Sequence, residues 1–253
     1  MRSLILPLLL SGLFAATGTT TAANAQQAKS GLLTRTVKVD GTSYSYQVFV
    51  PAQLAGKRDV PVIVFLHGIG QRGEGGFVPT EGVAGTFARQ YLEQMQAVVV
   101  LPQCRKGKFW HDPEMERMVM AGLEQTASEF GADQKRLYLI GVSMGGFGAW
   151  HLAGSQPGKF AAVVPICGGS TLATGDRFTP LAKKIGRTPV WAFHGSDDRV
   201  VPVTESRQMV DSLKRVEGNR VRYSEYKGVG HNVWLNVAAE PELLSWLLGQ
   251  RAE

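Results

Sequence analysis

The chain has 253 residues, and 44% of them are hydrophobic, which suffices for one α/β domain of ordinary size. The formal net charge is +6, and the Lys and Arg residues are spread along the chain without forming a tract. A nucleic-acid-binding protein usually shows a basic stripe or a recognisable module, so we expect no nucleic-acid partner.

The N-terminus has the pattern of a signal peptide. Arg2 provides the positive start, residues 4–16 form a short apolar run, and Ala23-Asn24-Ala25 offers a cleavage site of small residues. The run is too short to span a bilayer comfortably, and no cysteine lies near the cut to carry a lipid. We therefore expect residues 1–25 to be removed. Residues 26–253 then form one exported domain, periplasmic or secreted, with no stable membrane anchor.

The first elements of that domain are two predicted strands over 34–39 and 43–50, joined by a turn at Asp40-Gly41. Further strands are predicted over 60–66, 97–101, 137–140, 160–166, 189–193 and 221–226, and helices over 82–96, 114–130, 147–152, 181–185, 204–216 and 241–248. Antiparallel strands followed by this alternation predict an α/β fold. We expect a mostly parallel central sheet flanked by helices on both faces, an N-terminal antiparallel hairpin and, because residues 168–188 are few, no large lid domain.

The most informative stretch is the strand over 137–140, which runs into a Gly-x-Ser-x-Gly motif centred on Ser143. A buried strand, a very tight turn and a helix are the context of a nucleophile elbow. Gly141 and Gly145 have no side chains to collide where the turn closes, and Ser143 is held in a strained conformation at a helix N-terminus. The motif therefore predicts a serine hydrolase, against the alternative of a glycine-rich turn with an incidental serine.

A serine hydrolase also needs two donors for the oxyanion of its tetrahedral intermediate. The residue after the nucleophile, Met144, supplies one backbone N–H. Ile69 is the candidate for the second, because Gly68 and Gly70 flank it in a turn after the strand over 60–66. His67 precedes the nucleophile in chain order, so we interpret it as a structural side chain that braces this loop.

The acid and the base of a catalytic triad are expected after later strands, at the same edge of the sheet. Asp197 and Asp198 both follow the strand over 189–193, and either position suits the acid. His231 lies on a glycine-flanked loop after the last strand, which gives the chain order Ser, Asp, His of this architecture. The other histidines lack this combination; His194 is interpreted as a buried strand-end residue and His151 as part of the elbow helix.

The mature chain resembles the α/β-hydrolase superfamily, and within it the exported esterases and predicted peptidases related to feruloyl esterases, polyhydroxybutyrate depolymerases and prolyl oligopeptidase. The motifs that carry the resemblance are His67-Gly68-Ile69-Gly70, Pro102-Gln103-Cys104 with Trp110 downstream, Gly141-Val142-Ser143-Met144-Gly145-Gly146, Pro165-Ile166-Cys167-Gly168-Gly169, His194-Gly195-Ser196-Asp197-Asp198 through Val201-Pro202, and Gly228-Val229-Gly230-His231. The resemblance implies carboxylic-ester hydrolysis with no cofactor and no metal, and its pattern selects Asp198 as the acid. Relatives often have proline after the residue that corresponds to Cys104, where this chain has Arg105, so their substrates do not transfer directly.

Two further features concern the surroundings of the site. Phe109 and Trp110 are candidates for lining an acyl or alcohol pocket, with ordinary packing as the alternative. Cys104 and Cys167 follow strands that two other strands separate in the usual order of this fold, roughly 14 Å apart at normal spacing. A disulfide needs Cα atoms within about 7 Å, so two free, buried thiols are favoured.

Together these residues predict acyl transfer through Ser143, with His231 as base, Asp198 as its orienting acid and the amides of Ile69 and Met144 as oxyanion donors. The expected partner is a small-molecule or polymer-linked ester with a short or aromatic acyl group. A serine peptidase of the prolyl-oligopeptidase type and a non-catalytic binding protein are the alternatives. The oligomeric state does not follow from the sequence.

Overall fold

The computed structural model describes residues 30–75, 96–172 and 174–253. The predicted signal peptide, and all but the last residue of the helix predicted over 82–96, lie outside these residues. None of the helices in the described ranges is long and apolar enough to cross a membrane.

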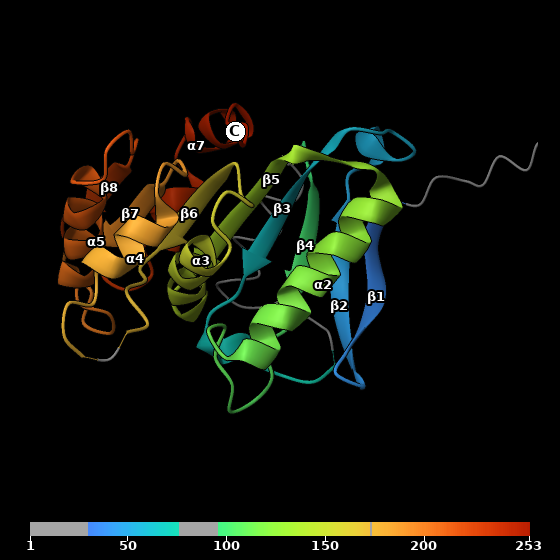
Figure 1. Cartoon of the computed structure of the whole chain (residues 1–253), viewed down its shortest axis with the longest axis horizontal. Coiled ribbons are helices and arrows are strands. Elements are labelled where there is room, and N and C mark those ends of the chain that lie inside the picture. Colours follow the sequence, from blue (N-terminus) through green and yellow to red (C-terminus); the bar gives the residue numbers. More distant parts are fainter. Residues whose placement is uncertain (1–29, 76–95, 173) are drawn as a thin grey trace, which may run out of the picture.

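The described strands form one sheet of eight strands in the order β1-β2-β4-β3-β5-β6-β7-β8 (Figure 1). Their bounds are Gly31–Val39 for β1, Thr42–Val50 for β2, Val60–Leu66 for β3, Val98–Pro102 for β4, Ala132–Val142 for β5, Ala162–Ile166 for β6, Trp191–Gly195 for β7 and Arg222–Tyr226 for β8. β1 pairs antiparallel with β2, and β2 pairs antiparallel with β4, whereas all remaining pairs are parallel. The predicted hairpin and mostly parallel sheet are therefore confirmed.

Helices cover both faces of this sheet. Their bounds are Pro113–Phe130 for α2, Met144–Ser155 for α3, Thr179–Ile185 for α4, Thr204–Lys214 for α5, Trp234–Ala238 for α6 and Leu243–Leu248 for α7, with single 3-10 turns at η1 (Ala52–Leu54) and η2 (Ile69–Gln71). Buried residues of α2 to α5 share one hydrophobic cluster, and those of α6 and α7 share a second cluster on the opposite face. The short helix α6 was not predicted.

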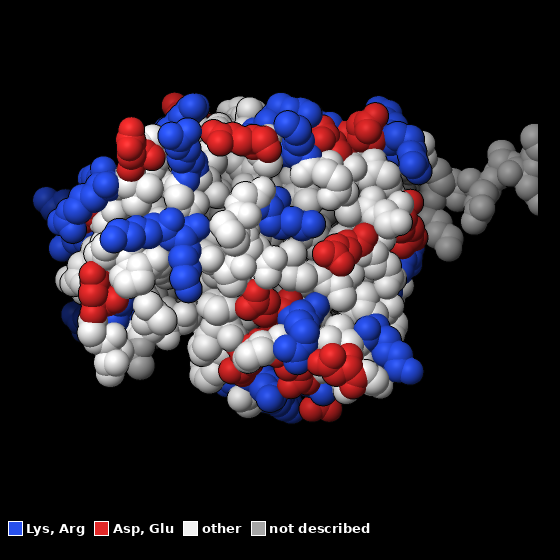
Figure 2. Space-filling view, viewed as in Figure 1, with Lys and Arg blue, Asp and Glu red and all other residues white. Residues whose placement is uncertain are grey.

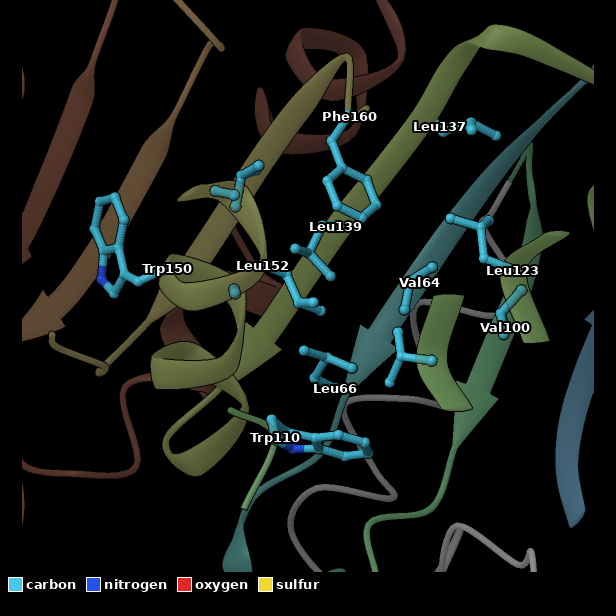
Figure 3. Close-up of a cluster of buried hydrophobic side chains, with 14 of the residues drawn as sticks. Val64, Leu66, Val100, Trp110, Leu123, Leu137, Leu139, Trp150, Leu152 and Phe160 are labelled. Carbon is cyan, nitrogen blue, oxygen red and sulfur yellow. The ribbon is translucent and has the colours of Figure 1, made fainter. Parts of the chain in front are cut away.

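β3 shows why the central strands read as continuous apolar runs. All seven of its residues are buried, with Val62, Val64 and Leu66 in one cluster and Ile63 and Phe65 in the other. Successive side chains of a strand point to opposite faces, so a strand covered on both sides has no polar position. Figure 3 shows Val64 and Leu66 packed among side chains of neighbouring strands and helices.

Charged side chains lie on the outside of this core. On the face shown in Figure 2, Lys and Arg side chains are mixed with Asp and Glu side chains rather than gathered in one stripe. The distribution agrees with the spread of charge along the sequence.

Candidate active site

Ser143 occupies a strained turn between β5 and α3. Its backbone has φ 55 and ψ −116, a conformation that non-glycine residues rarely adopt. A Cβ atom on Gly141 would lie 2.0 Å from the carbonyl oxygen of Gly145, and one on Gly145 would lie 2.0 Å from that of Leu66. Only glycine fits at either position, and this local geometry holds the serine clear of the strand end.

Three side chains that are far apart in the sequence meet at this serine. Ser143 Oγ is 2.8 Å from His231 Nε2, and His231 Nδ1 is 2.7 Å from Asp198 Oδ2. Because a carboxylate only accepts, Nδ1 carries the proton, and Nε2 is left to accept the serine hydroxyl. The ring of Trp234 packs perpendicular to His231 at 5.5 Å between centroids and limits its rotation.

The carboxylate of Asp198 is held at both oxygens. Oδ2 faces His231, and Oδ1 accepts the backbone N–H groups of Val200 and Val201 at 2.8 and 2.9 Å. Burial raises the pKa of Asp198. The hydrogen bond from His231, followed by those from the two backbone N–H groups, outweighs burial, so the pKa of Asp198 is lowered. Asp197 is exposed and accepts a hydrogen bond from Ser196 instead, so Asp198 is the aspartate that contacts His231.

The two predicted oxyanion donors are backbone amides close to Ser143. Ile69 begins η2 and Met144 begins α3, and the first N–H groups of a helix have no acceptor within it. The loop of Ile69 lies directly beside the nucleophile, since a Cβ on Gly68 would be 3.7 Å from that of Ser143. This arrangement places both predicted donors next to the serine.

His67 supports this loop through backbone contacts, as the sequence indicated. Its Nδ1–H donates to the carbonyl of Gly68 at 2.7 Å, and its Nε2 accepts the N–H of Cys104 at 3.0 Å. Burial lowers the pKa of His67 to about 4, so the ring is neutral at pH 7. The ring therefore joins the loop after β3 to the end of β4.

A pocket of about 460 Å³ opens beside Ser143. Its walls are mainly apolar and include Ile69, Phe109, His111, Met144, Phe147, Leu172, Arg177, Val200 and Val201. Four of these side chains, Ile69, Phe109, Leu172 and Val200, are large hydrophobic groups that are at least 40% exposed. A larger pocket of about 850 Å³ is lined by residues such as Phe160, Arg187 and Ala252, and none of Ser143, Asp198 and His231 contributes to it.

Trp110 does not line the pocket, and its predicted role there is wrong. The residue is fully buried; its indole N–H donates to the carbonyl of His67 at 2.9 Å, and its ring packs beside Leu66 (Figure 3). Phe109 does face the pocket, where His111 stacks on it at 5.5 Å and the guanidinium of Arg72 lies 5.4 Å from its ring.

The comparisons with known proteins agree with this geometry. The model of the phospholipase/carboxylesterase family, a group of α/β-hydrolases, matches residues 111–239. The chain belongs to this family. A bifunctional acetylxylan esterase/xylanase from Neocallimastix patriciarum is 26% identical over 164 residues, which are 64% of this chain and 22% of that protein.

Solved structures similar to this chain include esterases. A thermostable esterase has a TM-score of 0.76 and 31% identity, with 87% of this chain and 63% of that chain covered. A feruloyl esterase module from Clostridium thermocellum, complexed with sinapinate, has a TM-score of 0.68 and 14% identity, with 89% and 90% covered, and so shows the shared fold. The chain thus spans less than two thirds of the curated relative and of the thermostable esterase.

Both cysteines of the chain are free and buried, as expected. Cys167 lies close to the site: its Sγ, a carboxylate oxygen of Asp198 and a ring nitrogen of His231 lie within 4.8 Å of one another. This set of ligand atoms could hold a metal ion, but Asp198 and His231 are hydrogen-bonded to each other, and burial raises the pKa of Cys167 and opposes the thiolate that a metal needs.

The pocket also contains residues that sequence reasoning missed. His111, Phe147, Leu172 and Val200 line it, and Arg177 is held at its edge by a two-fold ion pair with Glu205. Phe147 and Val200 could have been found from position, because each follows a predicted site residue by two to four positions. His111 follows the predicted pocket residue Phe109 by two positions and could have been found in the same way, whereas Leu172 reaches the pocket through the course of a long loop.

Proposed function

We propose that this protein is an exported serine hydrolase that cleaves carboxylic esters through an acyl-enzyme on Ser143. The observation that carries the proposal is the hydrogen-bonded series Ser143–His231–Asp198 beside the amides of Ile69 and Met144. In this mechanism His231 accepts the serine proton as the oxygen attacks the ester carbonyl, and the two amides stabilise the oxyanion. His231 then protonates the departing alcohol, and water resolves the acyl-enzyme by the reverse sequence.

The pocket supports a short or aromatic acyl group as the preferred substrate. Its walls are mainly apolar, and exposed side chains such as Leu172 and Val200 line it beside the nucleophile, so an alcohol group on a sugar or polymer can extend into solvent. A long acyl chain would need a deep tunnel to bury its methylenes at about 0.8 kcal/mol each. The acetylxylan esterase/xylanase and the feruloyl esterase module carry such activities in their names, which agrees with this substrate class.

Replacement of the nucleophile tests the activity. Ser143→Ala should lower ester turnover on the order of 10³-fold or more, while the protein keeps its fold and its thermal unfolding midpoint. A fluorophosphonate probe should label the wild type only. Equal labelling of both proteins would show that Ser143 is not the nucleophile, and no turnover of any ester by the wild type would favour the non-catalytic alternative.

A substrate panel tests the class. Acyl esters of increasing chain length, feruloyl esters and acetylated sugars are compared with aminoacyl anilides. Catalytic efficiency should peak with short or aromatic acyl groups and fall beyond roughly C8. Anilides should be slower, because the amine is a poorer leaving group that His231 must protonate as it departs. Efficiency that rises through C16 would indicate a lipase, and equal anilide turnover would indicate a peptidase.

A further inference from the structure

His194 is a completely buried polar residue at the end of β7 that has no part in the mechanism above. Burial lowers the pKa of its ring, which is therefore neutral at pH 7. A neutral imidazole has one donor and one acceptor nitrogen, and both find partners here. Its Nε2 is 3.0 Å from the carbonyl oxygen of Val201, and its Nδ1 is 2.7 Å from the hydroxyl of Ser206 on α5.

These contacts determine which nitrogen of His194 is protonated. A carbonyl oxygen can only accept, so Nε2 carries the proton and points it towards Val201. Nδ1 is then the bare nitrogen, and the single hydroxyl proton of Ser206 is donated to it at 2.7 Å rather than to the carbonyl oxygen of Gly168, which is 3.3 Å away. The carbonyl of Val201 thus selects the tautomer in which the proton of His194 faces the acid loop, and the hydroxyl of Ser206 stabilises that tautomer by donating to Nδ1.

The same proton lies close to the candidate triad acid. His194 Nε2 is 3.3 Å from Asp198 Oδ2, the oxygen that also accepts from His231 Nδ1 at 2.7 Å. We propose that His194 is a positioning residue for Asp198, and that Ser206 supports its ring by a hydrogen bond to Nδ1. Ser143, His231, Asp198, His194 and Ser206 then form one continuous series of contacts from the nucleophile to α5. The inference rests on the proposed function, because it concerns how the acid is held.

This role has a kinetic consequence that packing alone would not have. His194 does not line the substrate pocket, so its loss should leave substrate binding almost unchanged. It acts on the oxygen that fixes the tautomer of His231, and misplacement of that oxygen slows proton transfer from Ser143. The expected effect is therefore on kcat rather than on KM.

Two amide replacements of His194 distinguish a role in positioning Asp198 from a role in packing alone. The amide nitrogen of Gln reaches about as far as Nε2, whereas that of the shorter Asn reaches only the position of Nδ1. His194→Asn should lower kcat on the order of 10- to 10²-fold with KM changed by less than about 3-fold, and His194→Gln should restore most of the loss. Equal losses in both variants, or wild-type kcat in His194→Asn, would overturn the proposal.

A milder pair of variants keeps the test decisive if the substitutions at His194 prevent folding. Ser206→Ala removes only the hydroxyl that donates to Nδ1 and should lower kcat by about 3- to 10-fold. Ser212→Ala is the matched control, since Ser212 is a buried serine on the same helix that does not contact the site. Equal kcat in the two variants would refute the role of Ser206.

Proton NMR without substrate separates this inference from the proposed function. The strongly hydrogen-bonded Nδ1–H of His231 gives a far-downfield signal whose position depends on its bond to Asp198. That signal should move or broaden in Ser206→Ala and stay in place in Ser212→Ala. An unchanged signal in Ser206→Ala contradicts the inference even if the ester panel succeeds, and a moved signal supports it even if the panel fails.

Discussion

A His-Gly pair lies at the carboxyl end of both β3 and β7: His67-Gly68 begins the loop after β3, and His194-Gly195 ends β7, directly before the loop that carries Asp198. Both histidines are buried, and burial lowers the pKa of both rings. The two ring nitrogens of His67 contact backbone groups, the carbonyl of Gly68 and the N–H of Cys104, and its ring packs edge-on against that of Trp110 at 4.9 Å between centroids. The ring of His194 contacts a backbone carbonyl, a hydroxyl and a carboxylate.

The different partners give the two loops opposite chemical roles. Within one planar trans peptide, the carbonyl of Gly68 and the N–H of Ile69 point in opposite directions. His67 holds that carbonyl and so directs the N–H of Ile69 away from the ring, where it can serve as a donor. His194 instead supports an acceptor, the carboxylate of Asp198. A buried neutral histidine at a strand end thus preorganises whichever group its loop presents.

The largest effect is expected when the acceptor of the loop after β7 is removed. Asp198→Asn should lower kcat on the order of 10³- to 10⁴-fold, because an amide can stabilise the wrong tautomer of His231. Asp197→Asn is the matched control, since Asp197 is exposed and lies one position away. Steady-state kinetics with a short-chain ester measures both. Comparable losses would mean that the two aspartates are not distinguished by the contact with His231.

Removal of the donor in the loop after β3 should have the next largest effect. Ile69→Pro deletes the N–H of residue 69, and Gly68, at φ −76 and ψ 176, already has the extended conformation that precedes proline. Loss of one oxyanion donor should lower kcat on the order of 10²- to 10³-fold. Ile69→Ala keeps the N–H and should lose far less with an acetyl ester. Similar kinetics in the two variants would exclude this amide from the oxyanion hole.

The buried imidazole of His67 should also make stability depend on pH. Its pKa is about 4 in the fold and about 6.5 when unfolded, so between these values only the unfolded chain binds the proton. The free energy of unfolding should therefore fall as pH drops from 6.5 to 4, by about 3 kcal/mol from this residue. His67→Gln is expected to be less stable than the wild type at pH 8. The difference in free energy of unfolding between the two proteins should decrease by that amount when the pH falls to 4, because only the wild type loses the contribution of His67. Denaturant unfolding at several pH values measures this difference in free energy, and a difference that does not change with pH would contradict the lowered pKa of His67.

Much of this architecture could be predicted because central strands and the elbow carry strong local patterns. β3 is apolar throughout since both of its faces are covered, and Gly141 and Gly145 are required by the turn itself. The first five residues of β5 are mostly polar and were missed, because their pairing with β3 at Ala132, rather than their composition, extends the strand. α6 was missed because it is five residues long and buries only Val237.

The same distinction applies to the site. Ser143 and His231 could be predicted from motif and chain order, whereas the choice of Asp198 over Asp197 required the family pattern. The error at Trp110 has a physical cause: adjacent Phe109 and Trp110 are both large aromatic residues, and the sequence does not show which one turns inwards. Trp110 does so because its indole N–H has the carbonyl of His67 as a buried acceptor, a contact between segments 43 residues apart.

The smallest effects are expected from the side chains that the two loops contribute to the pocket wall. Ile69 follows β3 and is 50% exposed, and Val200 follows β7 and is 68% exposed. Ile69→Ala and Val200→Ala each remove methyl groups that can contact an acyl group. A fully buried carbon contributes about 0.8 kcal/mol, and part of each side chain remains in contact with water. In each variant, the catalytic efficiency for a butyryl or feruloyl ester, divided by that for an acetyl ester, should therefore fall about 3-fold. Competition between ester pairs measures this ratio directly. If both variants lower this ratio, the two loops form two walls of one acyl pocket. If only one variant lowers it, the other loop contacts the alcohol group of the ester, and the two loops then differ in substrate contact as well as in chemical role.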